Sequence, residues 1–311
     1  MIVQLNETGR LIVNAMDEQG LSEIIGGSGD TIAACEELFA AVHHLTLVKS
    51  DMSILDFGSG CGRLAVPMMQ FLSEKGAFVG IDIVPKLVEF TNKEIASRQK
   101  NFEFYLSSDE NKLYNKFLDV LKPDLAPTKQ LDDFPENRFD VISAFSVFTH
   151  LTDKEASGYL KKFRSLLKPD GKIIISCFLV NDSTREYLRN KQSTIPFPDE
   201  VFENRDVYYY AHDEELTAVG YLEDKFQKLA FDAGFEPFVT YHGHWCGRPI
   251  RQFYQDIIVL SPKPELPANF DPHSYLRINS DITVPEGADP TKVAKSHYLQ
   301  YGIVEGRNWS Q

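Results

Sequence analysis

The stretch Ser53-Ile-Leu-Asp56-Phe57-Gly58-Ser59-Gly60-Cys61-Gly62-Arg63 decides the fold of this chain. A short apolar run ends here in a glycine-rich turn, and an amphipathic stretch follows over 63–75. Glycine tolerates positive φ and has no Cβ, so a ligand can approach the backbone closely. Backbone N–H groups in such a turn, with the start of the next helix, can hold a carboxylate or phosphate. The stretch therefore predicts a strand, a ligand-binding turn and a helix.

A second buried strand is predicted at 77–83, where Val79-Gly80-Ile81-Asp82 closes it. Asp82 follows Gly62 by 20 residues. An acidic side chain there is placed to accept both ribose hydroxyls of a nucleoside that lies across the strand ends. The turn has the form G-x-G-x-G after Asp56, whereas a dinucleotide fingerprint has the form G-x-G-x-x-G. This spacing argues against a nicotinamide dinucleotide as the ligand.

Strands and helices alternate through most of the chain. Further strands are predicted at 102–106, 139–145 and 172–180, and helices at 31–47, 85–98, 153–167 and about 214–233. The segments 235–241 and 255–260 are expected to form a closing antiparallel pair. This order predicts an α/β fold with a doubly wound, Rossmann-like, mostly parallel sheet. We divide the chain into an N-terminal helical segment (1–50), a ligand-binding domain (51–262) with a lid (181–215), and a small helical C-terminal tail (263–311).

The composition excludes several classes of partner. The 311 residues carry a formal charge of -13, and the pI is about 5.1, which argues against an electrostatic grip on nucleic acid or anionic lipid. The four cysteines are far apart and form neither a zinc pattern nor a disulfide framework. Apolar runs are strand-sized and no secretory signal is visible, so we expect no membrane span and a cytoplasmic location.

Several motifs resemble those of a known family. The G-x-G-x-G turn after Asp56 is similar to motif I of class I S-adenosylmethionine (SAM)-dependent methyltransferases, where it holds the methionine half of SAM. Four other segments resemble a bacterial group of these enzymes. They are S-V-F-T-H-L at 146–151, the L-K-P-D-G turn at 167–171, N-x-x-Y-N at 111–115, and G-x-W-C-G-R at 243–248 with Gln255-Asp256.

The resemblance implies SAM as cofactor and a set of contacts to it. The residues carried over are Asp56, Gly58, Ser59, Gly60, Arg63, Asp82, Ile83, Ser108 and Phe145. The group usually has Asp near position 108, so Ser107, Ser108 and Asp109 are alternative partners for the adenine amino group. Asp56 is expected to anchor the turn as well as to contact the cofactor.

Methyl transfer to a hydroxyl needs a base, and histidine has a suitable pKa near neutrality. His150 is the first candidate because it follows the fourth strand, and capping or loop order is its alternative role. His242 and His244 are the next candidates, placed on one face if the strand continues through them. A metal site formed by these histidines with Asp256 is conceivable, but no ligand spacing supports it. We expect no metal.

Trp245, Arg248 and Tyr209 are candidate substrate contacts, as a stacking wall and a polar contact. Their alternative roles are a packing aromatic and a salt-bridged arginine. The tail resembles a short repeat attached to bacterial glycosyltransferases and surface-polysaccharide proteins, through Phe270-Asp271-Pro272, His297-Tyr298, Tyr301-Gly302 and Glu305-Gly306-Arg307.

These observations predict a SAM-dependent methyltransferase that O-methylates a sugar or surface-glycan precursor. Methylation of a small metabolite or lipid is one alternative, and a non-catalytic SAM-binding scaffold in a polysaccharide assembly is another. The expected partner is a small-molecule or glycan acceptor. The tail is expected to pack on the domain, to support a homo-oligomer or to contact the glycan machinery.

Overall fold

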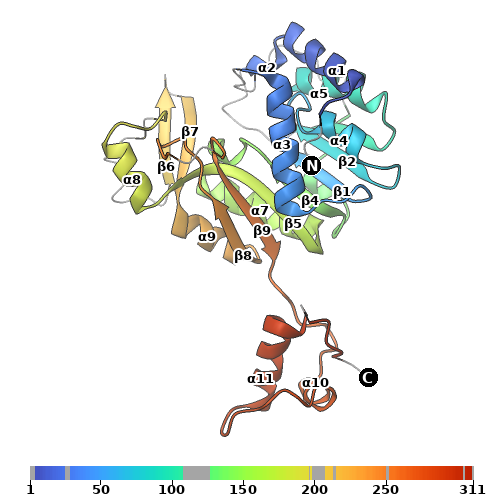
Figure 1. The fold of residues 1–311 in the computed structure, drawn as a ribbon, viewed down its shortest axis with the longest axis vertical. Coiled ribbons are helices and arrows are strands. Elements are labelled where there is room, and N and C mark those ends of the chain that lie inside the picture. Colours follow the sequence, from blue (N-terminus) through green and yellow to red (C-terminus); the bar gives the residue numbers. More distant parts are fainter. Residues whose placement is uncertain are drawn as a thin grey trace. The chain divides into compact units, whose positions relative to one another are not determined.

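A mostly parallel sheet organises the larger unit of the chain, Met1–Pro262 (Figure 1). In the part of the chain that the structure describes, nine strands join it, and the main order is β3-β2-β1-β4-β5-β7-β6. The strands are β1 (Ser53–Phe57), β2 (Ala77–Asp82), β3 (Phe102–Leu106), β4 (Phe139–Ala144), β5 (Leu167–Val180), β6 (Val207–His212), β7 (Glu215–Leu222), β8 (Phe235–Tyr241) and β9 (Asp256–Pro262). The expected doubly wound sheet is thereby confirmed.

This structure is a computed structural model that describes residues 4–24, 29–107, 127–195, 197, 207–212, 215–249, 252–303 and 305–309. For 207–212, 215–217 and 237 only the backbone is described. A smaller second unit, Lys263–Gln311, follows the sheet unit. The first fifty residues belong to the larger unit and form no separate body.

Strand β5 is the branching point of the sheet. Its first half and centre pair in parallel with β4, and residues Ile173–Cys177 pair in antiparallel fashion with β9, which in turn pairs with β8. Its last residues pair in parallel with β7, and β6 completes an antiparallel hairpin with β7. The chain order reverses at β1, which lies between β2 and β4. In open α/β sheets, ligands bind beyond the carboxyl ends of strands at such a reversal.

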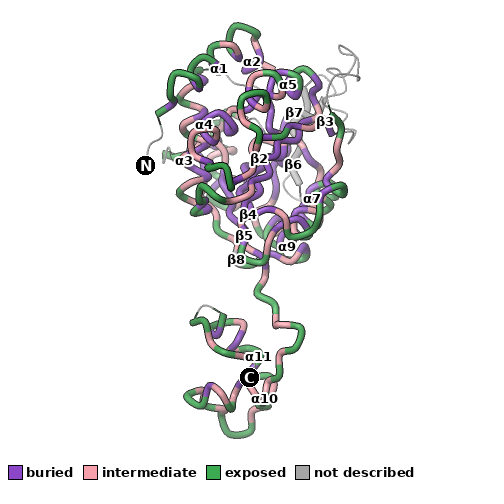
Figure 2. The backbone as a smooth tube through the Cα atoms, turned by 90° about the vertical axis from the view of Figure 1, so that its right-hand side faces the viewer, coloured by how far each residue is buried: buried purple, intermediate pink, exposed green. Residues whose placement is uncertain are grey.

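Successive residues of β1 belong to different cores. Ile54 lies in a hydrophobic cluster with the helices before and between the first strands, and Leu55 lies in a second cluster with α7 and α9. Side chains of a strand point alternately to the two faces of the sheet, so both faces are covered. Figure 2 shows the resulting buried interior of this unit. Its helices are α1 (Glu7–Glu18), α2 (Leu21–Ile24), α3 (Thr31–Thr46), α4 (Ala65–Phe71), α5 (Pro85–Thr91), α7 (Asp153–Leu166), α8 (Asp182–Arg189) and α9 (Glu223–Asp232).

The segment between β5 and α9 differs from the sequence prediction. The predicted helix at 214–233 is wrong in its first half, because β7 occupies Glu215–Leu222 and only α9 is helical. Pairing of β7 with both β5 and β6 outweighs the local helical pattern. The expected loop at 181–215 also contains α8 and β6. Tyr221 of β7 is buried, and its hydroxyl donates to the Phe148 carbonyl over 2.9 Å.

The second unit has its own small core. Helices α10 (Pro272–Ile278) and α11 (Pro290–His297) enclose Tyr275, Ala294 and Tyr298. Arg307 pairs with Asp281 over 2.7 Å and ties the end of the unit to its middle. None of the described helices, in either unit, is long and apolar enough to cross a membrane.

Candidate active site

A cavity opens at the carboxyl ends of β1, β2 and β4, where the chain order of the sheet reverses. Eight of the nine predicted cofactor residues line it: Asp56, Gly58, Ser59, Gly60, Arg63, Asp82, Ile83 and Phe145. The ninth, Ser108, lies outside the described residues, as does its alternative Asp109, whereas Ser107 lines the cavity. The tertiary structure thus brings together residues from three strand ends.

Asp82 lies at the centre of this arrangement. One carboxylate oxygen accepts the Gly60 N–H over 2.8 Å, and the other accepts the Val84 N–H over 2.9 Å. Burial raises the pKa of the Asp82 carboxyl, and the backbone hydrogen bonds act against this rise. Each oxygen has a second lone pair, so the carboxylate can still accept hydroxyl groups from the cavity. We therefore propose that Asp82 accepts the ribose hydroxyls of the cofactor.

The glycine turn serves the site through its shape. The N–H groups of Gly58 and Ser59 donate to the Ile81 carbonyl over 2.8 and 3.0 Å, and that of Gly60 donates to Asp82. These three donors are therefore used inside the protein, and the expectation that they hold an anion needs correction. Gly58 has φ of 78°, and a Cβ there would lie 2.3 Å from Val147 Cγ2. Only glycine fits between the two strand ends.

Arg63 supplies positive charge at the cavity. It lines the cavity, and it forms no hydrogen bond or ion pair within the described part of the chain. A guanidinium group binds a carboxylate with two parallel hydrogen bonds. We propose that Arg63 takes the role expected of the turn N–H groups and holds the methionine carboxylate of SAM.

Asp56, at the end of β1, is almost fully buried and accepts the Ser143 hydroxyl over 2.8 Å. Burial raises the pKa of its carboxyl to about 7, although the Ser143 hydrogen bond lowers it. The side chain lines the cavity and also ties β1 to β4. Asp56 is thus placed for both roles expected from its sequence, anchoring and cofactor contact.

His150 lines the same cavity, in a 3₁₀ turn at Phe148–His150 directly after β4. Burial lowers the pKa of its imidazole to about 4, so the ring is neutral at neutral pH but is a weaker base than the near-neutral pKa expected from the sequence would make it. A neutral imidazole can accept a proton. The Tyr221 hydroxyl holds this turn through its bond to the Phe148 carbonyl. His150 therefore meets the positional requirement for a general base.

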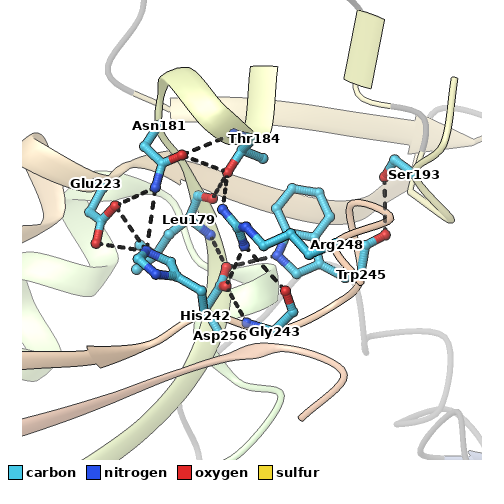
Figure 3. Close-up of polar contacts among 10 residues, drawn as sticks. All are labelled: Leu179, Asn181, Thr184, Ser193, Glu223, His242, Gly243, Trp245, Arg248 and Asp256. Carbon is cyan, nitrogen blue, oxygen red and sulfur yellow. Dashed lines mark hydrogen bonds and ion pairs between the residues drawn. The ribbon is translucent and has the colours of Figure 1, made fainter. Parts of the chain in front are cut away.

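The other two histidines lie elsewhere. Strand β8 ends at Tyr241, so alternation along a strand does not govern His242 and His244. Figure 3 shows the His242 ring beside Glu223 and Asn181, and its Nε2 lies 3.1 Å from the Glu223 carboxylate. This contact raises the pKa of His242. The His244 ring packs edge-on against Tyr254. Neither histidine is among the residues that line the described cavity.

Trp245 and Arg248 belong to a buried network around Asp256 (Figure 3). The Trp245 side chain is 0% exposed, and its indole N–H donates to Asp256 over 2.7 Å. Arg248 lies 3.2 Å from the other Asp256 oxygen, and its side chain is 9% exposed. Asp256 also accepts the N–H groups of Leu179 and Gly243, both over 2.7 Å.

These contacts match the alternative roles, a packing aromatic and a salt-bridged arginine. They differ from the expected substrate contacts because no face of the indole is left for a ligand. Tyr209 lies in β6, but its side chain is outside the described residues. Among the described residues no group of three or more His, Cys, Asp or Glu side chains is placed to hold a metal ion.

The structure adds cavity residues that sequence reasoning missed. Leu38 comes from α3, Tyr159 from α7, and Ser146, Val147 and Leu151 from the segment after β4. The S-V-F-T-H-L motif contained a signal for the last three, since it surrounds His150. Leu38 and Tyr159 carried no such signal, because helix packing alone places them at the cavity.

A reversal point in a mostly parallel sheet, a glycine turn, and a buried carboxylate at the end of β2 together define a class I SAM-dependent methyltransferase. SAM is its cofactor, and the residues at the cavity fit it. Arg63 suits the carboxylate of SAM, Asp82 suits the ribose, and the glycine turn lets the cofactor approach the backbone closely. The chain belongs to the family described as "Methyltransferase domain", whose match covers residues 33–236.

Two methyltransferases are similar to part of this chain. A phosphoethanolamine N-methyltransferase from Plasmodium falciparum (isolate 3D7) is 27% identical over 156 residues, which are 48% of this chain and 49% of that enzyme. The match thus spans about half the length of that relative. A ubiquinone/menaquinone biosynthesis C-methyltransferase from Shewanella sp. (strain W3-18-1) is 23% identical over 195 residues, 60% of this chain and 68% of that enzyme.

Among solved structures, the PH0226 protein from Pyrococcus horikoshii OT3 superposes with a TM-score of 0.51. It is 18% identical, and the alignment covers 76% of this chain and 93% of that one. At this identity the likeness concerns the fold alone.

Proposed function

We propose that this methyltransferase transfers the methyl group of SAM to a hydroxyl group of a sugar or surface-glycan precursor. The observation that carries the proposal is that His150, with a neutral imidazole, lines the same cavity as Arg63 and Asp82. Bound SAM supplies an electrophilic methyl group on a sulfonium that leaves readily. The protein has to hold the acceptor in line with that methyl group and exclude water.

In the proposed step, the acceptor oxygen bonds to the methyl carbon while the carbon–sulfur bond breaks, and its electron pair stays on sulfur. His150 takes the hydroxyl proton as the new bond forms and later releases it to solvent. Asp82 would hold the ribose and Arg63 the carboxylate of the cofactor during this step. The products are a methyl ether and S-adenosylhomocysteine.

The choice of a glycan acceptor rests on the resemblance of the tail to repeats of surface-polysaccharide proteins and on the charge of the cavity. Among its described lining residues, Arg63 is the only arginine or lysine, and we assign it to the cofactor. Protein sites that bind phosphate usually contain Arg or Lys. A neutral hydroxyl-bearing acceptor therefore suits the described lining better than a phosphate monoester does.

The second candidate is a small metabolite or lipid, which the names of the two relatives favour. A non-catalytic SAM-binding scaffold would be favoured if no acceptor-side cavity existed, or if His150 and His244 both pointed away from it. His150 lines the described cavity, which supports the catalytic proposal.

The proposal is tested with SAM carrying an isotopically labelled methyl group. The protein is incubated with separate pools of surface glycans, glycolipids, small metabolites and protein. Label in the glycan or glycolipid pool supports the proposal. Label confined to the metabolite pool supports the second candidate and overturns the first. The Asp82→Ala variant, which lacks the ribose contact, is the control for cofactor-dependent labelling.

A further inference from the structure

Ser146 has an unusual conformation for its position. It lines the cavity between β4 and the turn of His150, and its φ of 57° lies in the left-handed region that non-glycine residues seldom adopt. Residues held in this way persist only when surrounding contacts impose the conformation. Such a contact is present, because the Ser146 N–H donates to the Ser176 hydroxyl over 2.7 Å.

Gln255 joins these two serines. Its side-chain oxygen Oε1 accepts the Ser176 hydroxyl over 2.5 Å and the Ser146 hydroxyl over 3.3 Å. Ser176 lies on β5, and Gln255 directly precedes β9. The antiparallel register of these strands, which pairs Cys177 with Asp256 and Ser176 with Ile257, brings the two side chains together. We call this set of hydrogen bonds the relay, and the register of the sheet holds it in place.

The number of protons in the relay determines which of its groups can still donate or accept a hydrogen bond. The Ser176 oxygen accepts the Ser146 N–H, and its single proton goes to Gln255. The single proton of the Ser146 hydroxyl goes to the same Gln255 oxygen. A hydroxyl whose proton is used in this way can act only as a hydrogen-bond acceptor toward other groups. At the cavity wall, Ser146 therefore offers lone pairs and no donor.

We propose that Gln255 is a positioning residue that, with Ser176, fixes the Ser146 hydroxyl as a hydrogen-bond acceptor for a hydroxyl of the substrate next to the one that is methylated. The inference rests on the proposed function and narrows it. The methylated hydroxyl has a single proton, which is assigned to His150, so a neighbouring hydroxyl donates to Ser146 and this contact orients the methylated one beside His150. A sugar carries neighbouring hydroxyls of this kind.

The test compares Ser146→Ala, Gln255→Met and Gln255→Glu with the wild type. Ser165→Ala is the matched control, since Ser165 is exposed on α7 and its hydroxyl bonds only to its own helix, at the Lys162 carbonyl. Methyl transfer from labelled SAM into the pool that the wild type labels gives KM for that pool and kcat. Calorimetry with S-adenosylhomocysteine measures the cofactor site separately, and thermal unfolding checks that each variant is folded.

We expect Ser146→Ala and Gln255→Met to raise the acceptor KM about tenfold, the effect of one lost hydrogen bond. Their affinity for S-adenosylhomocysteine should stay close to that of the wild type. Gln255→Glu keeps an oxygen at the same place and should recover most of the loss, which a purely structural role would not predict.

An unchanged acceptor KM in a folded Ser146→Ala variant overturns the proposal, even if Gln255→Met unfolds. Failure of the glycan assignment looks different. In that case the wild type labels another pool, and the same variants are compared on that pool.

Discussion

The Asp82 carboxylate, at the end of β2, accepts the backbone N–H of Gly60, in the turn after β1, over 2.8 Å. The predicted ribose-binding residue thus also shapes the glycine turn. The glycine turn and the acidic end of β2 act as one unit, because a buried hydrogen bond transmits a change at one of them to the other.

Asp82→Ala should therefore weaken SAM binding by about 1–3 kcal/mol, since a charged hydrogen-bond partner of the ribose is lost and the turn loosens. Calorimetric titration with SAM measures this. Asp132→Ala, which removes a carboxylate from an exposed ion pair with Lys162, is the matched control and should bind as the wild type does. Equal affinity of Asp82→Ala and the control would remove Asp82 from the site.

Arg63→Met should lower SAM affinity by about tenfold or more, because the methionine carboxylate loses a charged hydrogen bond of about 1.5–3 kcal/mol. Arg98→Met is the control: Arg98 pairs with Glu94 at the surface and lies away from this cavity. If adenosine, which lacks the carboxylate, binds both variants with the same affinity, the loss is specific to that group. An equal loss for adenosine would contradict the assignment.

The pH dependence of SAM binding should report Asp56. Burial raises the pKa of its carboxyl from 3.8 to about 7, and the positive charges of bound SAM favour the ionised form. Binding then releases a proton, so affinity falls as the pH decreases below about 7, by at most tenfold per unit. The same raised pKa means that Asp56 makes folding less favourable as the pH rises from 3.8 to about 7.

Asp56→Asn should reduce this dependence of SAM affinity near pH 7, and Asp82, whose pKa burial also raises, accounts for what remains. His150→Gln should keep the full dependence. The reason is that the pKa of His150 is lowered to about 4, so His150 stays neutral throughout that range. Calorimetry from pH 5.5 to about 8 distinguishes the two residues. Loss of the dependence in His150→Gln alone would assign it to the histidine.

His150→Ala should leave SAM affinity nearly intact and reduce turnover about a hundredfold, as expected when a general base is lost. His273→Ala, at an exposed position in the second unit, is the control for histidine removal. Single-turnover transfer of labelled methyl into the accepting pool is the measurement. Normal turnover with His150→Ala would leave this residue a structural role in its turn.

Arg248→Met should destabilise the larger unit by about 3–5 kcal/mol, because it leaves the buried Asp256 carboxylate without its cation. Chemical unfolding followed by tryptophan fluorescence measures the loss, since Trp245 bonds to the same carboxylate. Lys228→Met, which breaks an exposed pair with Asp232, should change stability little. If Arg248→Met unfolds like the wild type and raises only the acceptor KM, the arginine is a substrate contact after all.

The gathering of the predicted cofactor residues around one cavity was largely predictable from the sequence, because they occur in a local order that a strand, a turn and a strand end impose. Gly58, Arg63 and Asp82 follow strands whose carboxyl ends meet at one edge of a parallel sheet. Once the alternation of strands and helices was recognised, their proximity followed. The placement of His150 at this cavity was predicted in the same way, since it follows β4.

The part of the site that binds the methyl acceptor was less predictable from the sequence. Trp245 and Arg248 resembled a binding wall in the sequence, yet Asp256 engages both in the interior. The helix predicted over β7 was wrong in its first half because two neighbouring strands supply hydrogen bonds that no local pattern reveals. Leu38 and Tyr159 reach the cavity only through the packing of α3 and α7.

The sequence by itself determined the α/β class, the glycine turn and the acidic end of β2, because backbone geometry and the two-residue and helical periodicities act over short distances. Only the tertiary structure decided that the turn N–H groups are used internally, that Arg63 is the available cation, and that Gln255 meets Ser146. Those relationships depend on the register of strands far apart in the chain, and a register is set by the packing of the whole sheet.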